Sequence, residues 1–321
     1  MVDVYFYEAF EEEHQELIKY LPAQIRAGFT WKTVQESGDE HPPALLISIR
    51  TQSQIPSEWC SQLEGILSRS TGYDHLQIYR KMSNNQIQLG YLPLYCNRAV
   101  AEQAMLLWMA LLRKLPRQME QFPDFNRDGL TGIECQGKTL LVVGVGNIGS
   151  EIVKIGEGLG MTVWGVDLVE KHSFVHYTTL EKALPRADII VCAMNLTEEN
   201  VSYFDYHRLK QARQGVIFIN IARGEMSPSR DLLRLVQENH LGGLGLDIYN
   251  RESELAITLR QKKESNDPEV QATLELMKYP QVIFTPHNAF NTIEAVQRKA
   301  QQSVQQIQHF LEEREFIWPV P

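Results

Sequence analysis

Three side chains with complementary chemistry each follow an expected strand. These are Arg223, Glu252 and His287. A guanidinium can bind a carboxylate through two parallel hydrogen bonds, and an imidazole can exchange a proton with a reacting oxygen near neutral pH. The strands are expected at Val216–Ile221, Gly243–Ile248 and Gln281–Phe284. Because the carboxyl ends of parallel strands share one edge of a sheet, we expect the three side chains at that edge.

A glycine-rich turn lies between an apolar run and a helix-like segment. Leu140–Val143 predicts a buried strand, Gly144-x-Gly146-x-x-Gly149 follows it, and Glu151–Leu159 predicts a helix. The first glycine permits a tight turn, the second lets the backbone approach a pyrophosphate, and the third lets the helix sit close to the sheet. Amide groups at the helix N-terminus would then face the phosphates, so the segment predicts a dinucleotide site.

An acid follows the next strand, which is expected at Thr162–Asp167. Asp167 lies close to the roughly 20 residues past the glycines at which a ribose-binding carboxylate is expected. It would accept hydrogen bonds from the adenosine 2′ and 3′ hydroxyls and repel a 2′-phosphate. NAD is therefore favoured over NADP, although the nearby Lys171 leaves NADP open.

Composition excludes several classes of protein. The formal net charge of −9, with no block of Lys and Arg, argues against nucleic acid as a partner. The acidic N-terminus is unlike a signal peptide, and the apolar run at Met105–Leu112 is too short to span a bilayer. Four scattered cysteines fit reduced thiols in the cytoplasm, and the nine histidines show no metal-ligand spacing. We expect a cytoplasmic protein without a metal and without membrane contact.

The remaining pattern predicts two α/β domains with doubly wound parallel sheets. In the first hundred residues we expect strands at 2–7, 44–49 and 65–68 and helices at 11–20 and 58–63. A largely apolar helix at 99–115 should be buried between domains or subunits. Later strands are expected at 189–193 and helices at 206–212 and 231–238, with 251–279 as a charged surface excursion. A last helix at 292–314 should pack back on the first domain, which would then comprise 1–98 and 290–321, with 99–289 binding the dinucleotide.

Several separate blocks, in order, resemble the D-isomer-specific 2-hydroxy acid dehydrogenases. The blocks are Ser70–Asp74, Val100–Glu102, the glycine turn, Ala222–Gly224, Leu246–Asp247 with Glu252, and Thr285–His287. The resemblance implies two Rossmann-like domains with the active site in the cleft between them, NAD as the cofactor, a small 2-oxo or 2-hydroxy acid as the substrate, and a homodimer formed through the NAD-binding domain. Arg, Glu and His each have common structural uses alone, but in this order they favour catalysis.

The resemblance also implies roles for individual residues. Arg223 would orient the 2-oxo acid, His287 would exchange a proton with the carbonyl oxygen, and Glu252 would hold His287. A nearby carboxylate favours the imidazolium, whereas Arg223 opposes it. The expected cofactor contacts are Gly144, Gly146, Asn147, Ile148, Gly149, Asp167, Thr197, Ala222 and Asp247. The expected substrate contacts are Arg223, the backbone of Thr71, Gly72 and Tyr73, and the side chain of Tyr95, which resembles the substrate-facing tyrosine of the D-lactate branch.

Some departures from the family pattern keep alternatives open. Ser253 follows Glu252 where many relatives have proline, and the long segment before His287 is closer to the D-lactate branch. A dehydrogenase of phosphorylated hydroxy acids would need extra cations near the substrate, for which Arg69 and Arg98 are candidates. An NADH-sensing, corepressor-like protein is the alternative from another class, since relatives of that kind can keep the whole catalytic set. The substrate cannot be chosen from the fold alone.

Overall fold

The computed structural model describes residues 2–84 and 87–321 and consists of two compact units. Unit 1 comprises Met1–Cys96 and Asn291–Pro321, and unit 2 comprises Asn97–Phe290. Asn97, Arg98 and Phe290 thus belong to unit 2. Both units contain an α/β parallel sheet, which is the expected fold class.

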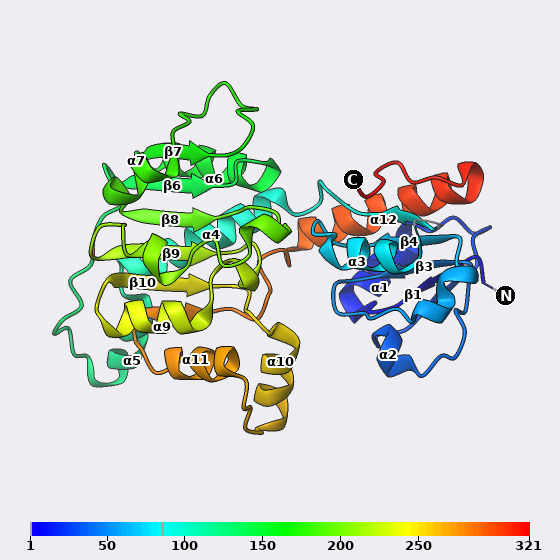
Figure 1. The fold of residues 1–321 in the computed structure, drawn as a ribbon, viewed down its shortest axis with the longest axis horizontal. Helices are drawn as coiled ribbons and strands as arrows, with labels where there is room; N and C mark the ends of the chain where they lie inside the picture. The colour runs from blue at the N-terminus through cyan, green and yellow to red at the C-terminus, as the bar shows by residue number, and fades with distance from the viewer. Residues whose placement is uncertain (1, 85–86) are drawn as a thin grey trace. The chain divides into compact units, whose positions relative to one another are not determined.

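Unit 1 is built on a parallel sheet in which the described strands have the order β2-β1-β3-β4-β5. The strands are β1 (Val4–Phe6), β2 (Ala27–Phe29), β3 (Leu46–Ile49), β4 (Gly65–Ser68) and β5 (Gln88–Gly90). The helices are α1 (Glu11–Tyr20), α2 (Val34–Ser37), α3 (Asp74–Met82) and α12 (Ile293–Glu313), with a 3₁₀ turn η1 (Ser57–Ser61). As expected, the last helix returns to this unit, where α12 packs against α1 and β4 (Figure 1).

Unit 2 has a parallel sheet in the order β11-β10-β9-β8-β6-β7 over the described residues. Its strands are β6 (Thr139–Val143), β7 (Thr162–Val166), β8 (Ile189–Cys192), β9 (Val216–Asn220), β10 (Leu241–Leu246) and β11 (Val282–Phe284). Strands β8 and β9 are buried along their whole length because helices cover both faces. The strand order reverses at β6, the point at which doubly wound sheets bind ligands.

The helices of unit 2 lie on the two faces of this sheet. They are α4 (Asn97–Leu112), α5 (Leu115–Gln121), α6 (Asn147–Gly158), α7 (Leu180–Ala183), α8 (Tyr206–Leu209), α9 (Ser229–Gln237), α10 (Glu252–Gln261) and α11 (Pro268–Leu276), with 3₁₀ turns η2 (Phe122–Asp124), η3 (Leu184–Arg186), η4 (Glu198–Asn200) and η5 (Gly224–Met226). Helix α4 packs on α6, β9 and β10, while α9 lies on the opposite face and contacts α11 (Figure 1). The apolar helix expected at 99–115 is largely buried by contacts within unit 2, and its expected place between domains or subunits stays a prediction.

Some of the expectations about helices and strands were wrong, and some elements of the structure were not expected. The segment expected as a helix at 58–63 is the 3₁₀ turn η1, a short turn whose buried Trp59 donates its indole N–H to the carbonyl of Glu40. The sequence reading missed the strands β2 and β5, because strands of three residues carry little periodicity. It also missed the helix α3.

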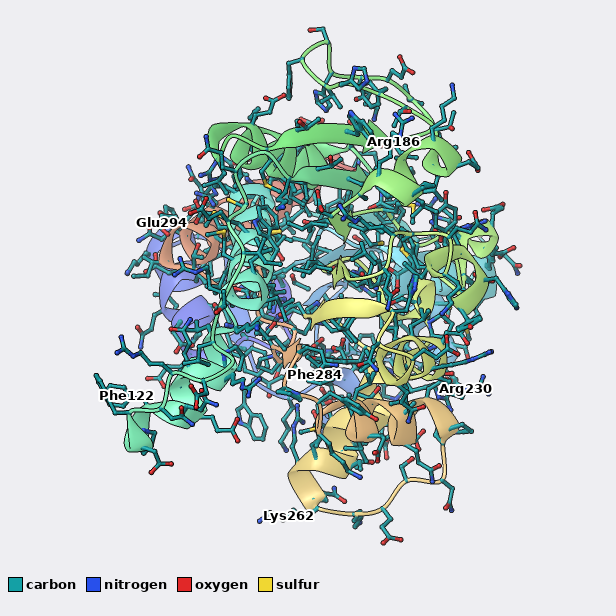
Figure 2. All side chains as sticks on the ribbon, turned by 90° about the vertical axis from the view of Figure 1, so that its left-hand side faces the viewer. Phe122, Arg186, Arg230, Lys262, Phe284 and Glu294 are labelled. Carbon is teal, nitrogen blue, oxygen red and sulfur yellow. The ribbon has the colours of Figure 1, made fainter. Side chains whose placement is uncertain are left out.

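The region 251–279, which was expected to be a charged surface excursion, forms two helices that were not expected. It contains α10 and α11, and Figure 2 shows Lys262 between them at an outer end of the unit. Asp267 caps α11 by accepting hydrogen bonds from the backbone N–H groups of Glu269 and Val270, and Pro268 suits the first helical position. Buried Val270 and Leu276 anchor α11, and Glu269 accepts a hydrogen bond from the backbone N–H of Ser229 at the start of α9.

Candidate active site

The glycine turn after β6 has the geometry that its sequence predicts. Gly144 has a φ of +91°, and a Cβ at this position would lie 2.6 Å from the backbone of Ala193 and Met194. A Cβ on Gly149 would lie 2.0 Å from the carbonyl oxygen of Gly144, so the helix approaches the strand as closely as the backbone allows. Gly146 precedes α6, and a Cβ there would meet nothing within 4 Å. The helix N-terminus is therefore open beside Gly146, as a phosphate site requires.

Asp167 lies next to this turn, one residue beyond β7. Its Oδ2 accepts a hydrogen bond from the backbone N–H of Val145 at 2.6 Å, and its Oδ1 accepts one from Val169 at 3.1 Å. The side chain is exposed, and each carboxylate oxygen can accept a second hydrogen bond. The carboxylate is thus held in place beside the glycines while it can still accept from a ribose hydroxyl.

The loop that carries Arg223 is organised by Asn220, the last residue of β9. The amide nitrogen of this fully buried side chain donates to the carbonyl of Arg223 at 3.0 Å and to the hydroxyl of Ser227 at 2.7 Å. Its amide oxygen accepts from the backbone N–H of Ala222 at 3.0 Å. Our reading of the sequence missed Asn220, although a polar residue closing an otherwise apolar strand was a usable signal.

At Gly224 the same loop packs closely against the segment that follows β10. A Cβ on Gly224 would lie 1.9 Å from the carbonyl carbon of Tyr249, so no larger residue fits without moving the backbone. The segment it touches leads directly into Glu252, the first residue of α10. Arg223 itself is half-buried, and its Nη1 donates to the carbonyl of Ala222 at 2.8 Å.

His287 and Glu252 are hydrogen-bonded to each other. The Nδ1 atom of His287 lies 2.8 Å from Oε1 of Glu252, although 35 positions separate the two residues in the chain. Both side chains are partly exposed, at 31% and 28% respectively. The hydrogen bond holds Nδ1, so the other ring nitrogen, Nε2, is the one available for proton exchange with a ligand.

Asp247 holds the turn on which His287 sits. Its carboxylate accepts from the hydroxyl of Thr285 at 2.5 Å and from the backbone N–H groups of Asn288 and Ala289, each at 2.9 Å. Burial raises the pKa of Asp247, while these three hydrogen bonds oppose the rise. At 1% exposure, this residue stabilises the left-handed turn at His287, whose φ is +50°. Its expected contact with the cofactor stays a prediction.

Tyr249 connects the same two loops and was also missed in the sequence. Its hydroxyl lies 3.1 Å from the carbonyl oxygen of Leu246 and 2.6 Å from that of Thr285. Burial raises its pKa well above the usual value for a tyrosine, so the hydroxyl keeps its proton and remains a donor. Tyr249 and Asp247 thus tie the end of β10 to the end of β11, where Glu252 and His287 meet.

The substrate residues expected near the N-terminus lie in unit 1, after β4. Ser70 donates to the carbonyl of Gly72 at 2.7 Å and Thr71 donates to the carbonyl of Leu92 at 3.1 Å, which shapes the turn from Thr71 to Tyr73. Tyr95 is buried at 4% exposure, and its backbone carbonyl accepts from Nε of Arg298 at 2.8 Å.

Neither cation suggested for a phosphorylated substrate is suited to that role. Arg69 is fully buried and donates to Glu13, Ser48, and the carbonyls of Tyr7 and Glu8. Arg98 is exposed on α4, where it pairs with Glu102 and Glu151. Both have protein partners that explain their positions.

Comparison with known proteins identifies the chain. Residues 105–289 match the family model of the D-isomer specific 2-hydroxyacid dehydrogenase, NAD binding domain. The chain belongs to this family. The predicted NAD cofactor is thereby confirmed. The predicted oxidoreductase class, in which a hydride moves between NAD(H) and a 2-oxo or 2-hydroxy acid, is confirmed as well.

Relatives of this dehydrogenase include enzymes with different substrates. An aromatic 2-oxoacid reductase from Clostridium sporogenes is 29% identical over 231 residues, which is 70% of this chain and 69% of that protein. A D-lactate dehydrogenase from Escherichia coli is 31% identical over 222 residues, 67% of this chain and 66% of that protein. A D-lactate dehydrogenase from Aquifex aeolicus, solved with NAD and lactic acid, superposes with a TM-score of 0.84 at 26% identity, covering 98% of this chain and 99% of that one.

Over the described residues, none of the histidines, cysteines and acids gather in threes as a metal site would need. The described helices include none with the length and apolar character required to cross a membrane. All four cysteines are free thiols.

Proposed function

We propose that Arg223, Glu252 and His287 are the catalytic set with which this dehydrogenase reduces a small 2-oxo acid to the D-2-hydroxy acid. The observation that carries the proposal is the 2.8 Å hydrogen bond between Nδ1 of His287 and Glu252. It leaves Nε2 as the proton donor to the carbonyl oxygen, on which negative charge develops during reduction. The bound dinucleotide supplies the hydride that the carbonyl carbon receives.

The chain's own residues can orient both ligands. The open helix N-terminus at Gly146 and the fixed carboxylate of Asp167 fit the pyrophosphate and the ribose of NAD. Asn147, Ile148, Thr197 and Ala222 complete the proposed cofactor contacts. Arg223 binds the substrate carboxylate and carbonyl, and the backbone from Thr71 to Tyr73 receives the same carboxylate. Tyr95 faces the rest of the substrate.

The direct test is oxidation of NADH, followed by absorbance, with a panel of 2-oxo acids. We expect turnover with at least one of pyruvate, hydroxypyruvate, glyoxylate, phenylpyruvate, oxaloacetate and 4-methyl-2-oxopentanoate. Tight NADH binding without any turnover on the panel would contradict the catalytic role and favour the NADH-sensing alternative. Retention of full turnover after Arg223→Gln would remove that residue from the proposed set.

We also propose that the chain forms a homodimer through unit 2. The segment from α5 to η2 exposes Met119 at 68%, Phe122 at 72% and Phe125 at 75%. Figure 2 shows Phe122 at an outer corner of the unit, away from the strands of the sheet. Neighbouring large apolar side chains at this exposure are typical of a surface that a partner covers, and a second copy is the partner that the family favours.

The oligomeric state tests this surface. Light scattering after size exclusion should give a dimer for the wild type and a monomer for Phe122→Asp combined with Phe125→Asp. An exposed pair on unit 1, Ile18→Asp combined with Trp31→Asp, is the control and should remain dimeric. A wild-type monomer, or an unchanged dimer in the first variant, would contradict the proposal. We place the protein in the cytoplasm, which its four free thiols favour.

A further inference from the structure

Three polar side chains form a hydrogen-bonded series next to the turn from Thr71 to Tyr73. Oγ of Ser68 lies 2.9 Å from Nε2 of His75 and 2.6 Å from Oγ of Ser70. Ser70 in turn donates to the carbonyl of Gly72 at 2.7 Å. Ser68 is the last residue of β4, and His75 lies in the first turn of α3. The series therefore connects the strand before the turn and the helix after it with the backbone of the turn itself.

The last hydrogen bond of this series fixes the direction of the others. A carbonyl oxygen can only accept, so the hydroxyl proton of Ser70 points to Gly72. Ser70 must then accept from Ser68, whose hydroxyl has a single proton to donate. Because that proton points to Ser70, Ser68 accepts from Nε2 of His75. His75 is therefore the donor at which the series begins.

The series also fixes the direction of a backbone N–H. The carbonyl of Gly72 and the N–H of Tyr73 belong to one planar trans peptide, in which they point in opposite directions. Ser70 is 8% exposed and Ser68 is fully buried, so the carbonyl points toward the interior and the N–H points away from it. Among the described residues, neither this N–H nor that of Gly72 has a protein acceptor. A substrate carboxylate would supply one.

A second support holds only the beginning of the same turn. Thr71 donates to the carbonyl of Leu92 at 3.1 Å, and the backbone N–H of Leu92 donates to the carbonyl of Ser70 at 3.0 Å. Neither hydrogen bond involves the peptide between Gly72 and Tyr73. The side chain of Ser70 is thus the one that orients this peptide, and the rest of the series holds Ser70.

We propose that His75 is a positioning residue for substrate binding. Through Ser68 and Ser70 it holds the peptide between Gly72 and Tyr73 so that the N–H points at the substrate carboxylate. The imidazole itself does not touch the substrate. This inference rests on the proposed function, because it concerns the binding of the same carboxylate. Since every 2-oxo acid carries that group, His75 should affect all of them alike.

The expected signature is a rise in KM at constant kcat. A contact with the carboxylate stabilises the bound substrate and the transition state equally, so weakening it raises KM alone. Ser70→Ala removes the donor to Gly72 and should raise KM for the best 2-oxo acid of the panel by about five- to tenfold, the usual weight of one hydrogen bond. The value of kcat should stay within about twofold.

Two substitutions of His75 test whether the series begins at its ring. His75→Leu removes the donor to Ser68 and should raise KM as Ser70→Ala does. His75→Gln keeps an N–H donor at the end of the side chain and should bring KM back to within about twofold of the wild type. Leucine fills the space of the ring as well as glutamine does, so the difference between the two variants reports the hydrogen bond.

The matched control is Ser83→Ala, which should change neither KM nor kcat. Ser83 is a buried serine at the other end of α3, and its hydroxyl also donates to a backbone carbonyl, that of Arg80. Oxamate, an unreactive amide analogue of pyruvate, measures the carboxylate contact without turnover through quenching of NADH fluorescence. The Kd for oxamate should rise together with KM in Ser70→Ala and His75→Leu, while the Kd for NADH should stay unchanged.

The outcomes separate this inference from the proposed function. Wild-type turnover with an unchanged KM in Ser70→Ala and His75→Leu overturns the inference and leaves the proposed function in place. An equal rise in KM in His75→Leu and His75→Gln also overturns it, as does a fall in kcat or in NADH affinity that accompanies the rise. Absence of wild-type turnover with every 2-oxo acid overturns the proposed function and this inference with it. Ser70→Ala removes a single oxygen atom, so it keeps the test decisive if His75→Leu does not fold.

Discussion

Each unit contains a carboxylate that is paired with nitrogen groups, but the surroundings of the two pairs differ. In unit 2, His287 and Glu252 are hydrogen-bonded but remain 31% and 28% exposed. In unit 1, Arg69, Lys299 and Glu13 are almost completely buried, with side-chain exposures of 0%, 2% and 5%. Exposure makes the first pair accessible to the ligand with which we propose that it exchanges a proton. Burial keeps the second group at fixed positions inside the fold.

The supports of the two sites also differ. Asp247 accepts hydrogen bonds from Thr285, Asn288 and Ala289, and these bonds fix the turn that contains His287. Lys299 is instead positioned by a helix, α12, which comes from the other end of the chain and packs on α1. A loop can place a side chain beside a reacting atom, and a packed helix can hold a charged side chain in the protein interior. Substitutions in the two units should therefore have different consequences.

The largest effect is expected in unit 2, at the proposed proton donor. His287→Ala removes Nε2 and should lower kcat by about 10²–10⁴-fold, the usual contribution of a general acid. NADH affinity should stay nearly unchanged, because the glycine turn and Asp167 do not involve His287. Stopped-flow turnover and fluorescence titration with NADH measure the two quantities. His207→Ala, an exposed histidine of the same unit, is the control, and an unchanged kcat in His287→Ala would exclude the proposed role.

A smaller effect is expected where Gly224 seats the Arg223 loop. Gly224→Ala places a Cβ 1.9 Å from the backbone of Tyr249, so the loop must shift. A displacement of about 1 Å at a positioning residue can cost about 10²-fold in kcat/KM. We expect a loss of this order for every 2-oxo acid of the panel, since we propose that Arg223 binds the carboxylate that all of them share.

The control for Gly224→Ala is Gly158→Ala at the end of α6, where a Cβ meets nothing within 4 Å and activity should not change. Steady-state kinetics with oxaloacetate and 4-methyl-2-oxopentanoate provide the comparison.

The candidate site in unit 2 could be predicted because its residues directly follow strands. Arg223, Glu252 and His287 come after β9, β10 and β11, and neighbouring parallel strands end at the same edge. The sequence did not predict the hydrogen bonds that fix the loops after these strands. The amide of Asn220 and the hydroxyl of Tyr249 reach carbonyl groups whose positions depend on the loop conformation. Periodicity carries no information about such contacts.

The sequence could not predict that the charged residues of unit 1 lie together. Glu13, Arg50, Arg69 and Lys299 come from four segments, and no spacing rule connects them. One signal was nevertheless present, since Lys299 lies four residues after Ala295 and four before Ser303, within the buried stripe of α12. A lysine in such a stripe needs a partner, but only the packing of α12 on α1 shows that the partner is Glu13.

The smallest effect concerns stability and is specific to unit 1. Burial lowers the pKa of Lys299 from 10.5 to about 7, so between these pH values the unfolded chain binds more protons than the folded chain at this position. Lys299 therefore contributes a free energy of unfolding that rises with pH in this window, by at most about 1.4 kcal/mol per pH unit. Glu13, Arg69 and Arg50 face the ammonium. Burial opposes the ionised form of Glu13, but the neighbouring cations lower its pKa overall, while burial raises the pKa of Cys96.

Lys299→Met should remove this rise, and urea unfolding of the whole chain at pH 7, 8 and 9 measures it. The wild type should gain stability relative to the variant as the pH increases, whereas Lys19→Met, which changes an exposed lysine of α1, should follow the wild type at every pH. Parallel curves for the wild type and Lys299→Met would show that the ammonium stays fully charged in the folded state throughout. The ammonium of Lys299 would then act as a permanent buried charge, like the guanidinium of Arg69.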